Sequence, residues 1–275
     1  MLYDEKAVAR IKETLYETLQ AAIDAVPTDN KEREIILLED VSENVNIPKN
    51  NNIILNLNNN TISSQSQVTI KAYGTLVLMN GTVKSTEKNA FYNYGNTIIK
   101  GNNTILSSES SSKATISNAS GAKLIINDGL IESKNCTTIF NHKNGEVIID
   151  GFNVRINNKS ASNEAIGNDG SVIIKKGLIY SENGYALRNS SASITFKIGN
   201  EDLVSNSSPC FIVDSKDYAF YKQGGTIEFY SGIIKSKFDV DQNSNITSLK
   251  SGYTMTRVDK RDTSGYYESY LQATN

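Results

Sequence analysis

Apolar and polar residues alternate in a phrase that recurs along most of this chain. Its first half runs apolar–x–Asn, two or three polar residues often ending in Gly, and then apolar–x–apolar. Copies of this half lie at residues 91–95, 138–149 and 165–174. Its second half, Gly or Asn-Gly followed by apolar–x–Ser, lies at 80–85, 128–133, 176–181 and 231–236. A repeat of 20–50 residues is typical of a solenoid, in which each unit buries its apolar face against its neighbours.

The repeat is irregular in length, and this restricts the kind of solenoid. The glycines that open the second half are separated by 20 to 33 residues, and they are Gly81, Gly101, Gly129, Gly151, Gly177, Gly199 and Gly232. Such variation argues against a strict short-period helix. It favours coils of three short strands joined by turns and variable loops. The sequence therefore predicts an all-β, single-stranded parallel β-helix with about eight or more coils between residues 34 and 237.

Strand pleating predicts which side chains face the interior of each coil. In the second strand of a coil, the first and third apolar residues should point inward and stack on their copies about 4.8 Å above and below. The expected inward pairs are Leu76 and Leu78, Leu124 and Ile126, Val172 and Ile174, Ile194 and Phe196, and Ile227 and Phe229. The third strand should add Val83, Ile105, Ile131, Val154 or Ile156, Ile179, Val204 and Ile234.

The two ends of the chain depart from the repeat. Apolar residues recur at three- and four-residue steps and predict a helix over residues 4–26, with Asp4 as N-cap and Pro27 beyond its end. Residues 252–258 and 266–271 flank Asp262–Thr263–Ser264–Gly265 and predict a hairpin. We therefore expect one continuous domain with a capping helix at 1–33, a solenoid at 34–237 and a hairpin cap at 238–275. The caps would cover the open ends of the core.

One polar residue recurs at the same turn of successive coils. The row consists of Asn93, Asn118, Asn141, Asn168 and Asn189. Asn tolerates the left-handed backbone of tight turns, and stacked amides can bond to their copies in neighbouring coils. We interpret the row as a structural amide ladder rather than as a ligand site.

Composition and charge narrow the function only slightly. A formal net charge of −2 over 275 residues, with scattered lysines, gives no basic patch for nucleic acid. No apolar run reaches the ~20 residues of a membrane span, and the first residues lack the pattern of a secretory signal. Cys136 and Cys210 fall several repeats apart, so we expect no disulfide between them. The chain is then either cytosolic or the mature or excised part of an exported protein. Its heavy use of Asn, Ser and Thr favours the second interpretation, a secreted or cell-surface protein.

Three phrases carry a resemblance to a known family. Residues 55–62, 78–83 and 126–131 resemble the pectate-lyase-like right-handed parallel β-helix, and most closely its Asn- and Gly-rich bacterial surface-protein branch. Residues 18–23 are similar to the capping helix of that family. The resemblance implies a right-handed coil. It leaves the activity open, because the superfamily includes lyases, hydrolases, phage tailspikes, adhesins and passive stalks.

The signatures of the enzymes in this family do not recur here. The polygalacturonase type has Asp–Asp and Gly–His–Gly, whereas this chain has no adjacent aspartates and has a single histidine in Asn141–His142–Lys143. The pectate-lyase type has Trp–x–Asp–His, and this chain has no Trp. We therefore expect a non-enzymatic adhesin, scaffold or binding module that needs no cofactor. The alternatives are a divergent lyase or hydrolase of acidic polysaccharide, and a phage tail fibre or tailspike segment.

The chain offers weak candidates for chemistry. Asp128 and Asp150 precede glycines on consecutive coils, where stacking would bring their carboxylates ~5 Å apart, a spacing that suits calcium or a retaining glycosidase. Asp–Gly is also an ordinary turn pair. A contact between His142 and Asp169 is conceivable, but no third group completes a catalytic set.

The outer surface offers two further candidates. The row Val77, Ile98, Ile125, Ile148, Ile173 and Thr195 should point outward from the second strands. An apolar outer row indicates a contact site for another protein or a second copy, although strand propensity or a covering segment of the chain would also explain it. Outward Tyr180 and Tyr230 offer flat faces for sugar rings, and Tyr92, Tyr94, Tyr218 and Tyr221 lie near one corner.

Overall fold

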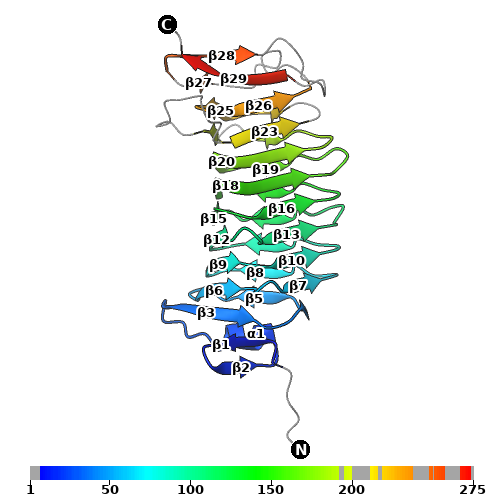
Figure 1. Ribbon diagram of the computed structural model, residues 1–275, viewed down its shortest axis with the longest axis vertical. Coiled ribbons are helices and arrows are strands. Elements are labelled where there is room, and N and C mark those ends of the chain that lie inside the picture. Colours follow the sequence, from blue (N-terminus) through cyan, green and yellow to red (C-terminus); the bar gives the residue numbers. More distant parts are fainter. Residues whose placement is uncertain are drawn as a thin grey trace, which may run out of the picture.

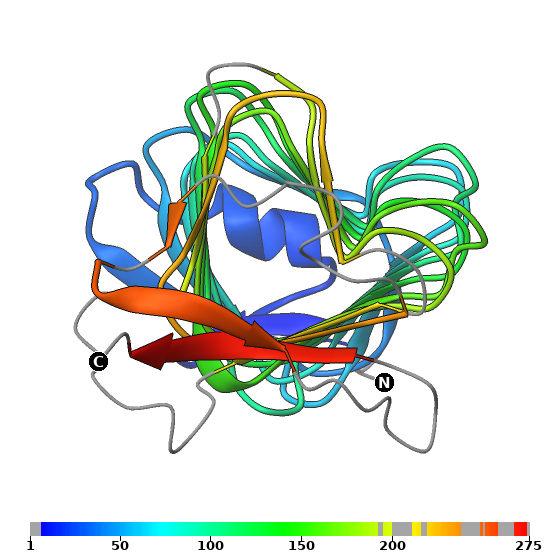
Figure 2. The ribbon, with the colours of Figure 1, turned by 90° about the horizontal axis from the view of Figure 1, so that it is seen from above.

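The computed structural model describes residues 7–191, 195–199, 211–215, 219–237, 248–249, 251–257 and 267–273. The chain forms an all-β solenoid of about seven stacked turns, which rise along the long axis of the molecule (Figure 1). Viewed along that axis, successive coils lie over one another (Figure 2). The predicted parallel β-helix is therefore confirmed, with slightly fewer coils than expected.

Each coil contributes three strands, as the repeat predicted. The first strands form an eight-stranded parallel sheet of β5 (Val45–Ile47), β8 (Ile70–Ala72), β11 (Phe91–Asn93), β14 (Ile116–Asn118), β17 (Ile139–Asn141), β19 (Ile166–Asn168), β21 (Leu187–Asn189) and β24 (Phe220–Lys222). The second strands are β3 (Glu32–Leu37), β6 (Asn52–Asn56), β9 (Thr75–Met79), β12 (Asn96–Lys100), β15 (Lys123–Ile126), the first parts of β18 (Glu146–Asn158) and β20 (Ser171–Ser181), β22 (Thr195–Ile198), β25 (Thr226–Phe229) and β27 (Ser248–Leu249).

The third strands are β4 (Val41–Ser42), β7 (Thr61–Ser64), β10 (Thr82–Ser85), β13 (Ile105–Ser108), β16 (Leu130–Ser133), the second parts of β18 and β20, β23 (Phe211–Ser215) and β26 (Ile233–Ser236). Because β18 and β20 run without interruption from the second to the third position, the two faces join into one 21-stranded sheet. The pairing of β18 with β20 is irregular between Ile149 and Arg155, and this irregularity marks the bend between the second-strand and third-strand faces.

The core is a set of vertical apolar rows inside the coil. Leu124, Val147, Val172, Phe196 and Ile227 occupy one row, in register, and all are fully buried. Two predicted members need correction. In β22 the inward pair is Phe196 and Ile198, and Ile194 lies outside the described residues. In β13 the inward residue is Leu106, which pairs with Val83, so Ile105 faces outward; Val204 lies outside the described residues.

The N-terminal helix is much shorter than the 4–26 predicted. Helix α1 covers only Leu19–Asp24, with Thr18 as N-cap accepting a hydrogen bond from the Ala21 amide, and Asp4 lies outside the described residues. Residues 9–11 and 14–16 instead form β1 (Ala9–Ile11) and β2 (Thr14–Tyr16), which pair antiparallel. The physical reason is that β1 also pairs antiparallel with β3 and so covers an open sheet edge, which a helix cannot do.

The capping role of this segment nevertheless holds. Leu19, Ala22 and Ile23 are fully buried, and α1 lies across the interior of the coil at its N-terminal end (Figure 2). Leu15, which the helical pattern assigned to the core, is 60% exposed because it lies on β2. The helical pattern therefore identified the buried residues of α1 and its flanks, Leu19, Ala22, Ile23 and Val26, but failed over the β1–β2 hairpin.

The predicted C-terminal hairpin is confirmed. Strands β28 (Tyr253–Arg257) and β29 (Tyr267–Ala273) pair antiparallel, and β29 pairs antiparallel with β26. The solenoid's last third strand therefore gains a hydrogen-bonded neighbour at the C-terminal end (Figure 1). The predicted turn at Asp262–Gly265 lies outside the described residues.

The row of turn asparagines forms the predicted amide ladder. The Asn93 side-chain amide donates to Asn118 Oδ1 at 2.8 Å, Asn118 to Asn141 at 2.8 Å, Asn141 to Asn168 at 2.9 Å and Asn168 to Asn189 at 3.1 Å. All five side chains are fully buried. The left-handed backbone expected of them is wrong, because none has a positive φ. Left-handed asparagines occur elsewhere, at Asn58, Asn59, Asn80 and Asn144 among others.

Candidate functional site

The outward apolar row of the second strands is a continuous feature of the surface. Register pairs Ile54 with Val77, Val77 with Ile98, Ile98 with Ile125, Ile125 with Ile148 and Ile148 with Ile173. We call these six residues the aliphatic ladder. Val77 is 8% exposed and the other five are partly exposed. The described part of the chain therefore contains no segment that seals this row from solvent.

The ladder differs from the predicted row at its C-terminal end. Thr195 pairs with Ser171, so it stands one column away, and the residue level with Ile173 is Lys197. The prediction that Thr195 points outward is consistent with the register of β22. Its predicted position along the strand is wrong by two residues, because Lys197 and not Thr195 is level with Ile173. Sequence analysis also missed Ile54 at the other end, because the first coil lacks the full phrase.

Charges close both ends of the ladder. Glu34 on β3 pairs in register with Ile54, and Lys197 pairs with Glu228, which it also meets as an ion pair at 3.7 Å. Neighbouring columns are polar except at Met79 on β9, and they include the Lys123–Glu146 ion pair at 2.7 Å. The result is an apolar stripe bordered mostly by polar and charged groups.

The predicted aspartate pair is not assembled as expected. Register carries Ile126 opposite Ile149, so the residue beside Asp150 is Asn127 rather than Asp128. Asp150 forms ion pairs with Lys175 at 3.5 Å and with Lys176 at 3.4 Å. The Asp128 carboxylate accepts a hydrogen bond from the amide of the next residue, Gly129, at 2.8 Å. Among the described residues, no group of three or more His, Cys, Asp or Glu side chains is arranged to hold a metal ion.

The other predicted candidates lie apart from one another. Tyr180 points outward from β20 at the third-strand position, and the Tyr230 hydroxyl donates to Glu228 at 2.8 Å. Tyr221 stacks on Tyr185 with ring centroids 4.7 Å apart, whereas Tyr218 lies outside the described residues. Cys136 is a free, partly buried thiol, and Cys210 lies outside the described residues.

The most elaborate surface is one that sequence analysis only touched. On the outer face of the eight-stranded sheet, Ser117 stands in register between Tyr92 and Phe140. This small residue leaves a hollow of about 460 Å³ between the aromatic rings and the loops that follow β10, β13 and β16. We call it the aromatic groove. In the sequence only its floor is visible, as the outward series Tyr92, Ser117, Phe140 and Gly167, in which large and small residues alternate; the loops that complete it are not.

Stacked rings build one wall of the aromatic groove. Tyr73 stacks on Tyr94 at 4.6 Å between centroids, and Tyr94 stacks on Tyr92 at 4.3 Å. His142 lies parallel to Tyr92 at 6.1 Å and meets the edge of Phe140 at 4.8 Å. These contacts fix the rings in one orientation, so the wall is preorganised.

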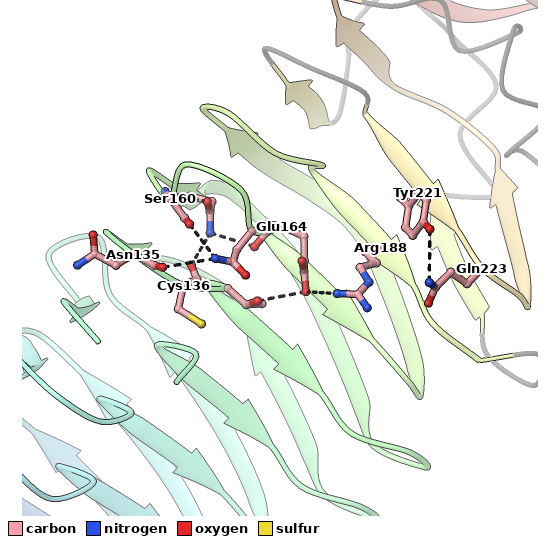
Figure 3. A network of polar contacts seen from close by, with 10 residues as sticks. Asn135, Cys136, Ser160, Glu164, Arg188, Tyr221 and Gln223 are labelled. Carbon is pink, nitrogen blue, oxygen red and sulfur yellow. Dashed lines mark hydrogen bonds and ion pairs between the residues drawn. The ribbon is translucent and has the colours of Figure 1, made fainter. Parts of the chain in front are cut away.

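A half-buried ion pair, Glu164 with Arg188, lies beside the groove residue Thr137, and Figure 3 shows this polar network. Glu164 is buried, with its side chain 6% exposed, and it fills the space above Gly167, where an added Cβ would lie 2.5 Å from its carboxylate. It accepts a hydrogen bond from the Thr137 hydroxyl at 3.1 Å and meets Arg188 at 3.5 Å. Because Arg188 offsets this charge, Glu164 adds little negative potential to the groove.

His142 gives the groove wall a titratable group. Burial lowers the pKa of His142 below its ordinary value, and the nearby Asp169 carboxylate opposes this by raising it. The expected His142–Asp169 relation is therefore electrostatic. At neutral pH the imidazole is uncharged, and its Nε2 lies 3.5 Å from the Tyr92 hydroxyl.

The lowered pKa predicts a pH-dependent loss of stability. The unfolded chain takes up a proton on His142 near pH 6.5, whereas the folded chain does so only at lower pH, so the free energy of unfolding should fall as pH drops below about 6.5. His142→Gln removes this contribution, and His142 is the single histidine of the chain. Urea denaturation at several pH values between about 7.5 and 5.5 should show a steeper loss for the wild type. Equal slopes for the two proteins would contradict a partly buried imidazole with a lowered pKa.

No helix among the described residues is long and apolar enough to cross a membrane. Comparison of the chain with known proteins found no matching family, no matching curated protein and no matching solved structure.

Proposed function

We propose that this protein is a non-enzymatic binding scaffold of the adhesin type, and that it works at a cell surface or outside the cell. The resemblance of its Asn- and Gly-rich phrases to pectate-lyase-like right-handed parallel β-helices supports the proposal. The observation that carries it is the aliphatic ladder, because an outer sheet face exposed to water is normally polar. A continuous β-branched stripe on such a face favours a protein contact.

The partner that fits the stripe is a second copy of this chain. A two-fold axis along the strand direction would reverse the rods and bring Ile98 of one copy over Ile125 of the other. The same axis would bring Glu34 opposite the partner's Lys197 at both ends of the stripe. With the rods parallel, Glu34 would meet Glu34 and Lys197 would meet Lys197. Charge therefore favours the antiparallel pair.

The size of the stripe sets the expected affinity. Six stacked positions span about 24 Å, and a five-residue strand spans about 17 Å. The face is therefore about half of the ~800 Å² per partner that a stable interface buries, so we expect a weak, reversible dimer. Weak individual contacts give a high overall binding affinity when several copies are displayed together, because each further contact forms at a high effective concentration.

The dimer can be tested by mutation of its centre. Ile98→Lys with Ile125→Lys would bring four ammonium groups together across the axis, and sedimentation velocity should then show a monomer at concentrations where the wild type dimerises. Circular dichroism checks that the variant still folds, which is expected because both side chains point outward. A wild type that stays monomeric at every concentration tested would overturn the proposal.

A charge exchange makes the test specific for the antiparallel arrangement. Glu34→Lys alone should weaken the dimer, and adding Lys197→Glu should restore part of it. These residues lie about 34 Å apart within one chain, so restoration can arise only between chains. A stable trimer would instead fit a tail-fibre segment, and release of reducing or unsaturated ends from an acidic polysaccharide would fit a hydrolase or lyase. Either result would contradict this proposal.

A further inference from the structure

We propose that the aromatic groove is a binding site for a negatively charged sugar unit, one or two pyranose rings that carry a carboxylate or a sulfate. The groove lies over the eight-stranded sheet, whereas the aliphatic ladder lies over the second strands. The inference is therefore independent of the proposed dimer.

The shape of the groove suits a sugar. A volume of about 460 Å³ lies within the range of small-molecule sites. Tyr92 and Phe140 stand two coils apart, so their rings are separated by about 9.6 Å along the rod, with Ser117 at the floor. Tyr92 stacks on Tyr94 and lies parallel to His142, which also meets Phe140, so the rings line the groove mainly with their edges. These apolar edges beside the Ser117 hydroxyl suit the mixed apolar and hydroxyl surface of a pyranose ring.

The floor and the second wall offer fixed polar groups. The Asn89 side-chain amide donates to Ala114 O at 2.6 Å and to Ser117 Oγ at 2.9 Å. Ser117 thus accepts one hydrogen bond and keeps its own proton to donate to a ligand. The Lys88 carbonyl accepts a hydrogen bond from Ser108 Oγ at 2.8 Å, which ties the loop after β10 to the next coil. The polar wall is therefore held in place before a ligand arrives.

The charge of the groove selects an anion. Lys88 and Lys113 line it, and neither has an ion-pair partner among the described residues. Two acidic residues of the neighbouring loops are already paired, Glu109 with Lys134 and Glu132 with Lys159 at 2.7 Å, whereas Asp169 lies near His142 on the opposite wall. Two unpaired ammonium groups beside an aromatic wall favour a ring that carries negative charge over a neutral one.

The ligand class can be tested by calorimetry with three probes. These are the unsulfated chondroitin disaccharide, its sulfated counterpart and neutral lactose. We expect both anionic disaccharides to bind at least about tenfold more tightly than lactose, a difference of about 1.4 kcal/mol. Carboxylate and sulfate are distinguished by which disaccharide binds more tightly. Equal affinity for lactose, or no binding by either anionic probe, would overturn the inference.

Two variants separate the two recognition elements. Lys88→Gln with Lys113→Gln should weaken the anionic probes at least about tenfold and reduce the salt dependence of binding. The matched control is Lys49→Gln with Lys100→Gln, which removes the same charge from exposed positions outside the groove and should leave affinity unchanged. Ser117→Phe should fill the hollow with a third ring and abolish binding while the fold is retained. If Ser117→Phe folds and still binds, the site lies elsewhere.

Discussion

Replacing Asn141 by Leu is expected to lower the free energy of unfolding by about 3 kcal/mol. Asn141 is the central member of the amide ladder and is fully buried. Its amide donates to Gly145 O at 3.0 Å, to Asn168 Oδ1 at 2.9 Å and to Ser171 O at 3.0 Å, and its oxygen accepts from Asn118. Leucine has a similar size and none of these groups.

The cost arises from the partners that remain. Gly145 O still accepts from the Ser171 amide, Asn168 Oδ1 from the Gly170 amide, and the Asn118 amide still donates to Ala122 O and Glu146 O. Each of these groups nevertheless loses one bond, as does Ser171 O, in a site that water cannot reach. Each buried polar group left unpaired costs about 1–3 kcal/mol. Because each coil of a solenoid contacts only its neighbours, the damage should also weaken the coupling between the two halves of the rod. Urea denaturation should therefore show a lower midpoint and a broader transition.

The matched control is Asn127→Leu. Asn127 is exposed, and only its backbone takes part in the hydrogen bonds between coils. We expect this change to alter stability by no more than about 0.5 kcal/mol. Equal losses for the two variants would mean that the ladder is not a buried hydrogen-bonded row.

The coil and most of its core could be predicted from the sequence, because strand pleating and a repeated phrase fix which residues face inward. Leu124, Val172 and Ile234 are buried as the alternation requires. Errors arose where a copy of the phrase was incomplete, as at Ile105, since the alternation there continues through Leu106 without a marker of its phase.

The N-terminal segment shows a different limit. Its apolar spacing fits a helix, but the sequence does not reveal that β3 has an open edge. The unpaired backbone groups of the β3 edge exist only once the sheet has formed, and β1 pairs with them. This tertiary pairing outweighs the helical periodicity of residues 9–16. The Thr18 cap and Pro27 were the local signals that marked the true, shorter helix.

Prediction of the surface sites depends on knowing the register between strands of successive coils. The aliphatic ladder could be predicted because its members share one position in the repeat. The aromatic groove could not, because it depends on loops of different length that meet over Ser117 from three successive coils. The sequence indicates only that Tyr92 and Tyr94 lie near a corner. Lys88 and Lys113 give no signal, since a lone lysine in a loop is usually a solvated side chain. Proteins of this fold therefore reveal their architecture in the repeat and their specificity in the exceptions to it.

A glycine of the ladder turn should be as sensitive as its asparagine. An alanine Cβ at Gly170 would lie 2.4 Å from Gly145 O, 2.7 Å from the Asn141 amide and 2.7 Å from His142 O. Two of these atoms belong to the backbone of the preceding coil, so the coils must separate and weaken the hydrogen bond from the Ser171 amide to Gly145 O, which measures 2.9 Å. We expect Gly170→Ala to cost about 3 kcal/mol, the upper range for overpacking.

Gly121→Ala separates this close approach from simple backbone strain. Gly121 has a φ of +75° and no atom within 4 Å of an added Cβ, so alanine there should cost only the ~1–2 kcal/mol of a left-handed residue. Urea denaturation of both variants should therefore rank Gly170→Ala as the more damaging, although Gly170 lacks a left-handed backbone. The reverse ranking would show that the coils do not approach as closely at this turn, and the amide ladder that depends on the same spacing would be in doubt with it.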